Sequence, residues 1–351
     1  MANPLPQATN AEHITRLLRR GGIIGGATVR DVVIESDRPT LLSRVIRLRL
    51  NYDGAAGEAP RSVFLKTARP ERIAFGSHSA SQEVAFYRNV AAASPPDLLP
   101  RCFDAHDDAA TQSWHLLLED LTDSHVLPTT WPLPPSQSQC EHIVAARARF
   151  HAAWWDDGRL GVSIGVRGDA ASKERFLRDF DEKYARLADR LGDDLSPEQR
   201  TLYERLRGST RLFKRLSSRR NLTIIHGDAH VWNCFMPRDG GDDVRLFDWD
   251  TWRIGLATTD LAYMMAVHWF PDRRRRMERS LLDHYHEVLL ENGVNGYDRQ
   301  ALDDDYRLAA LWQLITPLWQ AAYDIPPVVW WNHLQRIFLA VDDLGSRELM
   351  D

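Results

Sequence analysis

The 351-residue chain lacks the features that would place it in a membrane, in an oxidising compartment or on a nucleic acid. No segment reaches the roughly 18 to 20 consecutive apolar residues that a membrane-spanning helix needs, and residues 1–20 lack the basic-then-apolar order of a signal peptide. Its three cysteines cannot all pair and show no C-x-x-C spacing. A formal charge of −5 argues against a dedicated nucleic-acid binder. We therefore expect a cytoplasmic protein without a membrane span.

Lysine is scarce, and tryptophan is distributed unevenly along the chain. Only four of the 44 basic residues are lysines, and of 12 tryptophans only Trp114 lies in the first 120 residues. The two halves therefore differ in kind. With 44% hydrophobic and 26% charged residues, the composition is that of a globular protein long enough for two lobes.

The first 121 residues predict a small α+β lobe. Runs of apolar and β-branched residues predict five strands, over 29–36, 42–52, 62–67, 101–106 and 113–119. A helical period predicts a helix over 82–92, between the third and fourth strands. We expect an antiparallel five-stranded sheet with one helix, forming residues 1–121.

From Ser136 onward most segments have a helical period, so residues 122–351 predict a larger and mostly helical lobe. The expected helices cover 143–155, 173–191, 197–216, 259–270, 276–292, 303–322 and 328–344. The exception is a hairpin of strands 222–225 and 244–247, which we expect to carry the catalytic residues of segment 222–250. Trp312 and Trp319 are seven residues apart, which favours a buried helix face.

Polar residues follow both strands of this hairpin. Asp228 and Asn233 come after the first strand, and Asp248 and Asp250 come after the second. Phosphoryl transfer needs a carboxylate that accepts or orients the proton of the attacking hydroxyl. It also needs oxygen ligands for Mg²⁺, which an amide and a second carboxylate supply. Asp228, Asn233 and Asp248 provide that set.

The segment from His226-Gly-Asp to Asn233, followed by Asp248-Trp-Asp250, resembles the H-G-D-x-x-x-x-N and D-x-D/E motif of the aminoglycoside phosphotransferase and choline kinase-like family. Its Leu-Glu-Asp-Leu run, 118–121, and its Phe-His-Ala-Ala-Trp run, 150–154, are closer to the ecdysteroid kinase-like and choline kinase-like members than to the drug-resistance enzymes. The resemblance implies the bilobal, α+β protein-kinase-like fold, with a small antiparallel sheet lobe and a larger helical lobe. It covers about residues 29 to 265.

The same resemblance implies an ATP-dependent mechanism with Mg²⁺, in which ATP lies between the lobes and GTP is an alternative nucleotide. Its implied roles are a phosphate-binding lysine (Lys66), its carboxylate partner (Glu83), adenine-binding hinge residues (Glu119 and Leu121), a general base (Asp228), metal ligands (Asn233 and Asp248) and supporting residues (His226, Asp250 and Asp260). Residues 37–43 lack the glycines that cover the phosphates in many relatives, and Ser43 is our candidate for that task.

Three other functions remain open. The glycine-free loop fits a nucleotide-binding pseudokinase without turnover. His226, Asp228 and His230 fit a metallohydrolase, since histidine and carboxylate clusters bind zinc. A protein kinase is disfavoured, because Asp260 follows Asp248 by only twelve positions, which leaves little room for an activation segment.

The acceptor is expected to be a small hydroxylated molecule. An aminoglycoside-like compound would suit an acidic pocket, for which the second lobe offers Asp303–Asp305, Asp324, Asp342 and Asp343. The tryptophans and the run Arg273–Arg276 suit a less cationic acceptor such as a metabolite, sugar, lipid-like alcohol or natural product, although we interpret the arginine run first as a solvated helix face. The oligomeric state is not indicated.

Overall fold

The computed structural model describes residues 9–40, 43–69, 73–108, 110–111, 113–323 and 325–350, with only the backbone described for 73–80. Two positions raised above, Asp324 and the 41–42 part of the 37–43 loop, lie outside these residues. The chain forms two compact units. The first comprises Met1–Leu127 with Phe235–Thr251, and the second comprises Pro128–Cys234 with Trp252–Asp351. The segment 235–251 thus belongs with the sheet-bearing unit, whereas we expected it in a lobe that begins at residue 122.

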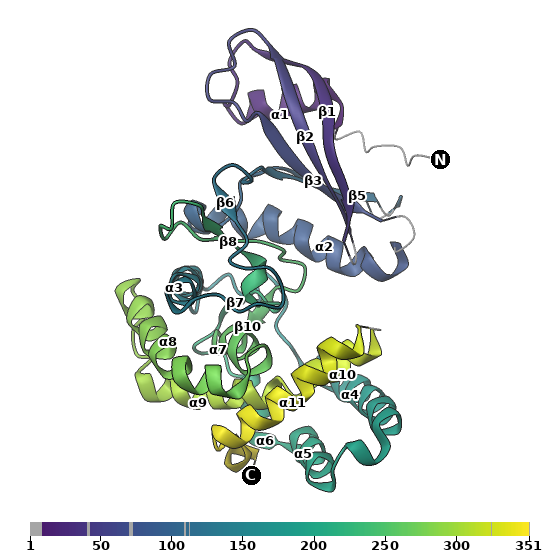
Figure 1. Cartoon of the computed structure of the whole chain (residues 1–351), viewed down its shortest axis with the longest axis vertical. Coiled ribbons are helices and arrows are strands. Elements are labelled where there is room, and N and C mark those ends of the chain that lie inside the picture. The colour runs from purple at the N-terminus through teal and green to yellow at the C-terminus, as the bar shows by residue number, and fades with distance from the viewer. Residues whose placement is uncertain are drawn as a thin grey trace. The chain divides into compact units, whose positions relative to one another are not determined.

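The first unit is built on a five-stranded antiparallel sheet (Figure 1). Its strands are β1 (Thr28–Pro39), β2 (Ser43–Asp53), β3 (Ser62–Ala68), β4 (Cys102–Asp108) and β5 (Ser113–Glu119), in the order β1-β2-β3-β5-β4. Helix α2 (Ile73–Asn89) follows β3 and begins nine residues earlier than the sequence predicts. The α+β fold class expected from the sequence is confirmed.

One face of this sheet is covered by α1 (Ala11–Arg20). Ile14 and Leu18 of the helix are fully buried against Ile46 and Leu48 of β2 and Leu65 of β3. In β3, buried and partly exposed residues alternate, as expected for side chains that point to opposite faces of a sheet. Lys66 therefore points to the face opposite the one that Leu65 occupies in the α1 core.

The expected hairpin of residues 222–225 and 244–247 is wrong. Strand β7 (Thr223–Ile225) instead pairs with β10 (Arg253–Gly255) in an antiparallel two-stranded sheet. Strand β9 (Arg245–Leu246) lies in a separate three-stranded sheet with β6 (His125–Val126) and β8 (Cys234–Pro237), in the order β6-β8-β9. The apolar run that forms β8 offers β9 a partner much closer along the chain than β7.

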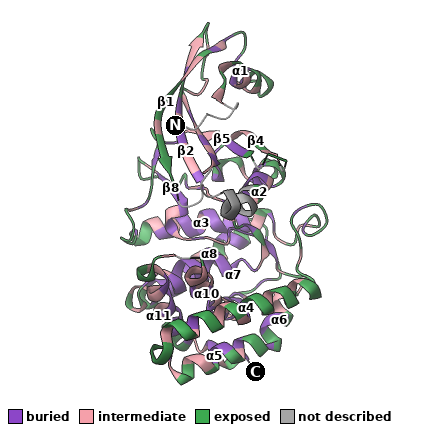
Figure 2. Ribbon diagram, turned by 90° about the vertical axis from the view of Figure 1, so that its right-hand side faces the viewer, coloured by how far each residue is buried: buried purple, intermediate pink, exposed green. Residues whose placement is uncertain are grey.

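The second unit is mainly helical (Figure 1). Its helices are α3 (Gln137–Ala153), α4 (Ala170–Leu191), α5 (Pro197–Gly208), α6 (Thr210–Leu216), α7 (Thr258–Ala262), α8 (Pro271–Glu291), α9 (Arg299–Trp312), α10 (Ile315–Ala322) and α11 (Pro327–Asp343). In Figure 2, α3 has many buried residues, whereas the visible face of α4 is mostly exposed. No helix among the described residues is long and apolar enough to cross a membrane.

Short helical turns complete the chain. In the first unit they are η3 (Ala91–Ala93) and η4 (Pro96–Leu98). In the second unit they are η5 (Gly192–Asp194), η6 (Val231–Asn233), the π-helical η7 (Tyr263–Val267) and η8 (Ser346–Met350).

Helix boundaries follow local capping chemistry. Ser136 and Gln139 form a reciprocal capping box at the start of α3, and Ser196 and Gln199 form another at the start of α5. The single helix expected over 303–322 is divided into α9 and α10. Pro317 explains part of this division, because proline has no N–H to donate to the carbonyl four residues earlier.

The tryptophan pair of the expected helix face packs inside the second unit. Phe176 of α4 stacks on both rings, with centroids 4.8 Å from Trp312 and 5.7 Å from Trp319. Both side chains are only half-buried and lie on different helices, Trp312 on α9 and Trp319 on α10. The pair therefore packs against α4 but does not form the single buried helix face that the sequence predicts.

The arginine run Arg273–Arg276 is only in part the solvated face that the sequence predicts, since Arg275 and Arg276 are exposed but Arg273 and Arg274 are not. Arg274 is only 2% exposed and pairs with Glu278 and with Asp343. Since a buried charge needs a partner, the two acids explain how a run of four cations is tolerated at the start of α8.

We predict that truncating the sheet core destabilises the first unit far more than truncating its surface. Ile46→Ala removes a fully buried side chain and should lower the free energy of unfolding by about 2–5 kcal/mol. Ile34→Ala, on the adjacent strand and 43% exposed, should cost less than about 1 kcal/mol. Urea denaturation followed by circular dichroism measures both, and equal losses would contradict the described core.

Candidate active site

In the first unit, three of the expected site residues meet at one ammonium group. Lys66 Nζ lies 2.6 Å from Glu83 Oε2 and 2.5 Å from Asp248 Oδ1. The side chains of Lys66 and Glu83 are 14% and 2% exposed, whereas that of Asp248 is 37% exposed. The cluster joins β3, α2 and the segment after β9, and Asp248 is its most accessible member.

The charge of this cluster is set by a competition between burial and neighbouring carboxylates. Burial by itself lowers the pKa of the Lys66 amine, but Asp248 and Glu83 outweigh it and raise that pKa above its ordinary value. Asp250 adds to the same effect. Lys66 is therefore a permanent cation at neutral pH.

Trp249, which separates the two aspartates, fixes their segment against α2. Its ring stacks on Phe86 with centroids 4.1 Å apart and planes 7° from parallel, and its Nε1 donates to the Leu246 carbonyl at 3.2 Å. Asp248 next to it has a φ of 68°, a backbone conformation that costs energy for a residue with a side chain. Because Phe86 is one turn after Glu83 on α2, this stacking brings Asp248 and Glu83 to the same amine.

The expected hinge is only partly available to a ligand. The Glu119 N–H donates to the Arg101 carbonyl at 2.8 Å, and the Leu121 carbonyl accepts from His125 N–H at 2.7 Å. Asp120 between them accepts hydrogen bonds from Ser62 and Arg47. Adenine binding by Glu119 and Leu121 stays a prediction.

Ser43 closes the turn between β1 and β2. Its hydroxyl lies 2.8 Å from the Thr40 hydroxyl, and its N–H donates to that hydroxyl at 3.0 Å. The side chain is buried, so its expected contact with phosphate stays a prediction that would require these bonds to rearrange.

In the second unit, Asp260 holds the loop that carries Asp228. The His226 N–H donates to Asp260 Oδ2 at 2.7 Å, and the Gly227 N–H donates to Oδ1 at 3.0 Å. Gly227 has a φ of 86°, which explains why glycine occupies this position. The buried His226 ring in turn accepts a hydrogen bond from the Asp228 N–H at 3.3 Å.

The Asp260 carboxylate is itself held in the interior as an anion. Burial alone raises its pKa, but the hydrogen bond and charge of His151, followed by the charge of Arg147, outweigh burial and bring the pKa well below the ordinary value. His151 Nε2 lies 3.3 Å from Asp260 Oδ2, and its Nδ1 bonds to the Tyr285 hydroxyl at 2.8 Å. Arg147 also donates to the carbonyl of Ala229 at 3.0 Å.

Asp228 stands within a small hydrogen-bonded network. The Tyr263 hydroxyl donates to its Oδ1 at 2.6 Å, and Asn233 Nδ2 donates to its Oδ2 at 3.1 Å. His230 Nε2 lies 3.5 Å from the same Oδ2. The carboxylate keeps 32% of its side chain exposed, so it is oriented by neighbours and still open to a substrate.

The hydrogen bonds of Asn233 and Asp248 show which of their oxygens already have partners. The Asn233 amide nitrogen donates to both the carbonyl and the carboxylate of Asp228, which leaves its Oδ1 without a donor among the described residues. Asp248 is partly exposed and uses Oδ1 for Lys66. Each residue thus presents an oxygen of the kind that Mg²⁺ prefers.

The metallohydrolase interpretation finds no support in the arrangement of its three residues. The His226 ring nitrogen nearest Asp228 accepts a backbone hydrogen bond instead of facing a shared metal position. Where the structure is described, the one group of histidine and acidic side chains close enough to share an ion is His13, Asp104 and His115.

Sequence reasoning missed Tyr263, Arg147 and the packing role of Trp249. Tyr263 follows Asp260 by three residues, so helical spacing could have placed it on the same face as that aspartate. Arg147 and Trp249 had no such signal, because their partners lie far along the chain.

The comparisons with known proteins concern the family and the fold of the chain. The model of the phosphotransferase enzyme family matches residues 54–302. No curated protein sequence matches.

Solved structures with a similar fold include the choline kinase of Cryptosporidium parvum, at 10% identity over 90% of this chain and 89% of that one, with a TM-score of 0.56. The Plasmodium vivax ethanolamine kinase has 11% identity over 90% and 83%, with a TM-score of 0.55. The streptomycin–ATP–APH(2")-IIa ternary complex has 14% identity over 98% and 99%, with a TM-score of 0.54. They confirm the predicted protein-kinase-like fold. Since the family model covers more than half of the sequence, the chain belongs to the phosphotransferase enzyme family and is a small-molecule kinase.

Proposed function

We propose that this protein transfers the γ-phosphoryl group of ATP to a hydroxyl group of a small molecule, with Asp228 as the general base. The observation that carries the proposal is the environment of Asp228. Its carboxylate is partly exposed, is oriented by Tyr263 and Asn233, and stands on a loop whose backbone is bonded to the buried Asp260. A base held in this way meets the first requirement of phosphoryl transfer, which is positioning.

Asp228 can act as the general base because its carboxylate is partly exposed to solvent. As the acceptor oxygen attacks the γ-phosphorus, its O–H bond breaks and Asp228 accepts the proton. The new P–O bond forms while the bond from the γ-phosphorus to the bridging oxygen breaks, and ADP leaves with that oxygen. Tyr263 and Asn233 keep the carboxylate aimed during this step, because each donates to a different oxygen.

Lys66 supplies positive charge for the nucleotide phosphates. Glu83 and Asp248 hold its amine in place, and the amine stays charged throughout. An ammonium group on a fixed stem binds phosphate oxygens without a proton transfer.

Asn233 and Asp248 are the proposed Mg²⁺ ligands, and a bound Mg²⁺ would neutralise charge on the phosphate oxygens. Asp250 raises the local negative charge that attracts a cation. ATP as the nucleotide is part of the proposal; among proteins with a similar fold, one solved structure holds ATP and two hold GDP.

We predict that Asp228→Asn loses catalysis and keeps nucleotide binding. Asparagine retains an oxygen for the Tyr263 hydroxyl but cannot take a proton, so acceptor-dependent ADP release should fall about 10²- to 10⁴-fold. The assay uses Mg·ATP with a panel of sugars, amino alcohols and aromatic alcohols. Asp242→Asn, on an exposed loop, is the control and should match the wild type. Turnover by Asp228→Asn at the wild-type rate would refute the assigned base.

We predict that Lys66→Met weakens nucleotide binding by at least about tenfold, because a charged hydrogen bond to phosphate contributes roughly 1.5–3 kcal/mol. The measurement is the concentration of Mg·ATP needed to raise the thermal unfolding midpoint. Lys214→Met removes an exposed lysine of α6 and should leave this concentration unchanged. An unchanged affinity in Lys66→Met would show that the amine does not contact the nucleotide.

A further inference from the structure

A cavity of about 240 Å³ lies in the second unit. Four aromatic side chains contribute to its wall: Trp131, Trp232, Trp269 and Phe270. Trp131 and Phe270 are 54% and 64% exposed, so they lie where the cavity opens to solvent. The volume is below the roughly 300–1,000 Å³ typical of drug-sized ligands, and it fits a compound with one or two rings.

This cavity adjoins the residues that orient Asp228. His268 lines it, and the His268 ring centroid lies 4.8 Å from that of Tyr263 and 5.5 Å from that of His230. Tyr263 and His230 both contact the Asp228 carboxylate. The cavity therefore lies next to the side chains that orient the proposed base.

Two arginines of the cavity wall have no acidic partner among the residues that the structure describes. Arg273 donates to the Pro135 carbonyl and stacks over Trp269, and Arg336 donates to the His268 carbonyl at 2.9 Å and stacks over Phe270. The Nε atoms of both are buried without a hydrogen-bond acceptor. Burial also lowers the pKa of Arg336, with no carboxylate to oppose it.

The other ionisable groups of the wall are uncharged at neutral pH. Burial, with the charges of Arg336 and His230, lowers the pKa of His333 to about 3. Burial also lowers the pKa of His268 well below its ordinary value. No Asp or Glu is among the described lining residues, so the cavity carries the net positive charge of two arginines.

We infer that this cavity binds the acceptor, and that the acceptor is an alcohol with a flat apolar ring and an anionic group such as a carboxylate. The inference rests on the proposed phosphotransferase activity and adds its substrate class. Aromatic walls suit a ring, and two guanidinium groups without acids suit an anion. A polycationic acceptor would instead be repelled by the two arginines, and it would find no carboxylate among the described residues of the wall to pair with.

The test uses three alcohols that share one ring and differ in charge: 4-(hydroxymethyl)benzoate, benzyl alcohol and 4-(aminomethyl)benzyl alcohol. Isothermal titration calorimetry measures binding without nucleotide, and ADP release with Mg·ATP measures turnover. The benzoate should bind most tightly and have the highest kcat/KM. Arg273→Gln and Arg336→Gln should each reduce its advantage over benzyl alcohol about tenfold or more, while Arg336→Lys should retain part of it.

Arg276→Gln is the matched control, because Arg276 is an exposed arginine of the same helix as Arg273 and is outside the cavity wall. Thermal unfolding verifies that each variant is folded. Preference for the ammonium compound, equal binding of all three, or an advantage unchanged in both glutamine variants would overturn the inference. Arginine-dependent binding of the benzoate with no product from any alcohol would support the cavity assignment and contradict the proposed function.

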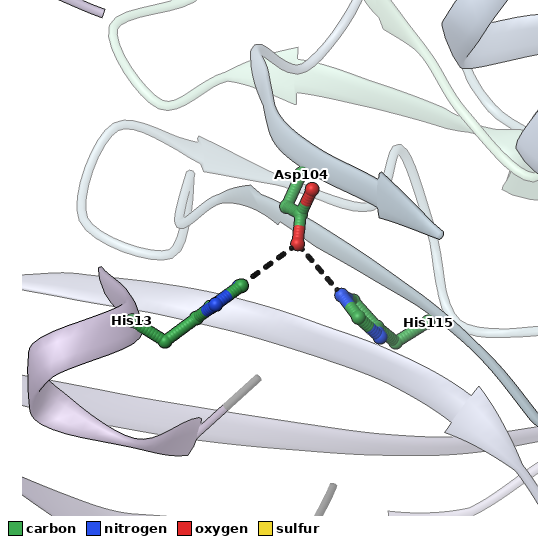
Figure 3. A group of neighbouring side chains, drawn as sticks. All are labelled: His13, Asp104 and His115. Atoms are coloured by element: carbon green, nitrogen blue, oxygen red, sulfur yellow. Dashed lines mark hydrogen bonds and ion pairs between the residues drawn. The ribbon is translucent and has the colours of Figure 1, made fainter. Parts of the chain in front are cut away.

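A second, independent site lies in the first unit, where His13 of α1, Asp104 of β4 and His115 of β5 converge (Figure 3). Asp104 Oδ2 lies 3.1 Å from His13 Nε2 and 2.8 Å from His115 Nε2. All three candidate ligand atoms lie within 4.8 Å of one another. The side chains are 31%, 22% and 11% exposed in the order His13, Asp104 and His115, so the site is partly shielded and still accessible.

The spacing and chemistry of these atoms fit a transition metal. Bonds of about 2.0–2.1 Å around a tetrahedral zinc ion place neighbouring ligand atoms roughly 3.3 Å apart, close to the two distances seen here. Two imidazoles and one carboxylate are ligands that zinc accepts.

We propose that His13, Asp104 and His115 bind a divalent transition-metal ion of the zinc type, which ties α1 to the β4–β5 edge of the sheet. The alternative is a pair of histidine–aspartate hydrogen bonds without an ion. The two differ in stoichiometric metal binding and in metal-dependent stability.

The test titrates chelator-stripped, full-length protein with Zn²⁺ in competition with a chromogenic chelator. We expect one ion per chain, and at least a tenfold loss of affinity in His13→Gln and in Asp104→Asn. His106→Gln is the control, because His106 is exposed and stacks on His115 without belonging to the cluster. Asp242→Asn, which removes an exposed carboxylate of the same unit, should also bind normally. No bound zinc, or equal affinity in both cluster variants, would overturn the proposal.

Discussion

The pair of hydrogen bonds from the His226 and Gly227 backbone to the buried carboxylate of Asp260 is the interaction on which the site in the second unit depends. A buried anion is costly unless it is paired and fully hydrogen-bonded. Here His151 and the two N–H groups meet that requirement. The loop therefore has one favourable conformation, and this conformation fixes the orientation of the Asp228 side chain. In the first unit the buried charge is positive: the Lys66 ammonium is kept charged by the carboxylates of Glu83 and Asp248. In both units the cost of burying charge is offset by groups that fix the position of a functional side chain.

The second unit also shows how a positively charged cavity persists beside a carboxylate. Burial keeps His268 and His333 neutral, so these rings line the cavity beside Arg273 and Arg336 without adding charge. The aromatic rings under both arginines hold them by cation–π contact and leave donors unused. Two proteins with a similar fold are a choline kinase and an ethanolamine kinase, whereas the described wall of this cavity carries two arginines and no carboxylate.

Local patterns predicted the parts of this protein whose structure is set by near neighbours in sequence. The strand at 113–119 was predicted with the bounds that the structure has, because its apolar run ends at the turn residues. The roles of Asp228, Asn233 and Asp248 were inferred from a motif of short spacing, and the structure supplies their hydrogen bonds. The pairing of β7 with β10 was not predictable, since it depends on segments that only folding brings together. The burial of Arg274 escaped prediction for the same reason, as its partner Asp343 is 69 residues away.

The central claim is that this chain moves a phosphoryl group to an alcohol, and its most direct test is product stoichiometry. Purified protein is incubated with Mg·ATP and a hydroxylated acceptor, and ³¹P NMR measures ADP, inorganic phosphate and phosphate monoester together. The account predicts one monoester for each ADP, with little inorganic phosphate. Bound ATP without any ADP would identify a pseudokinase, and ADP matched by inorganic phosphate alone would identify a hydrolase. Either result would contradict the account.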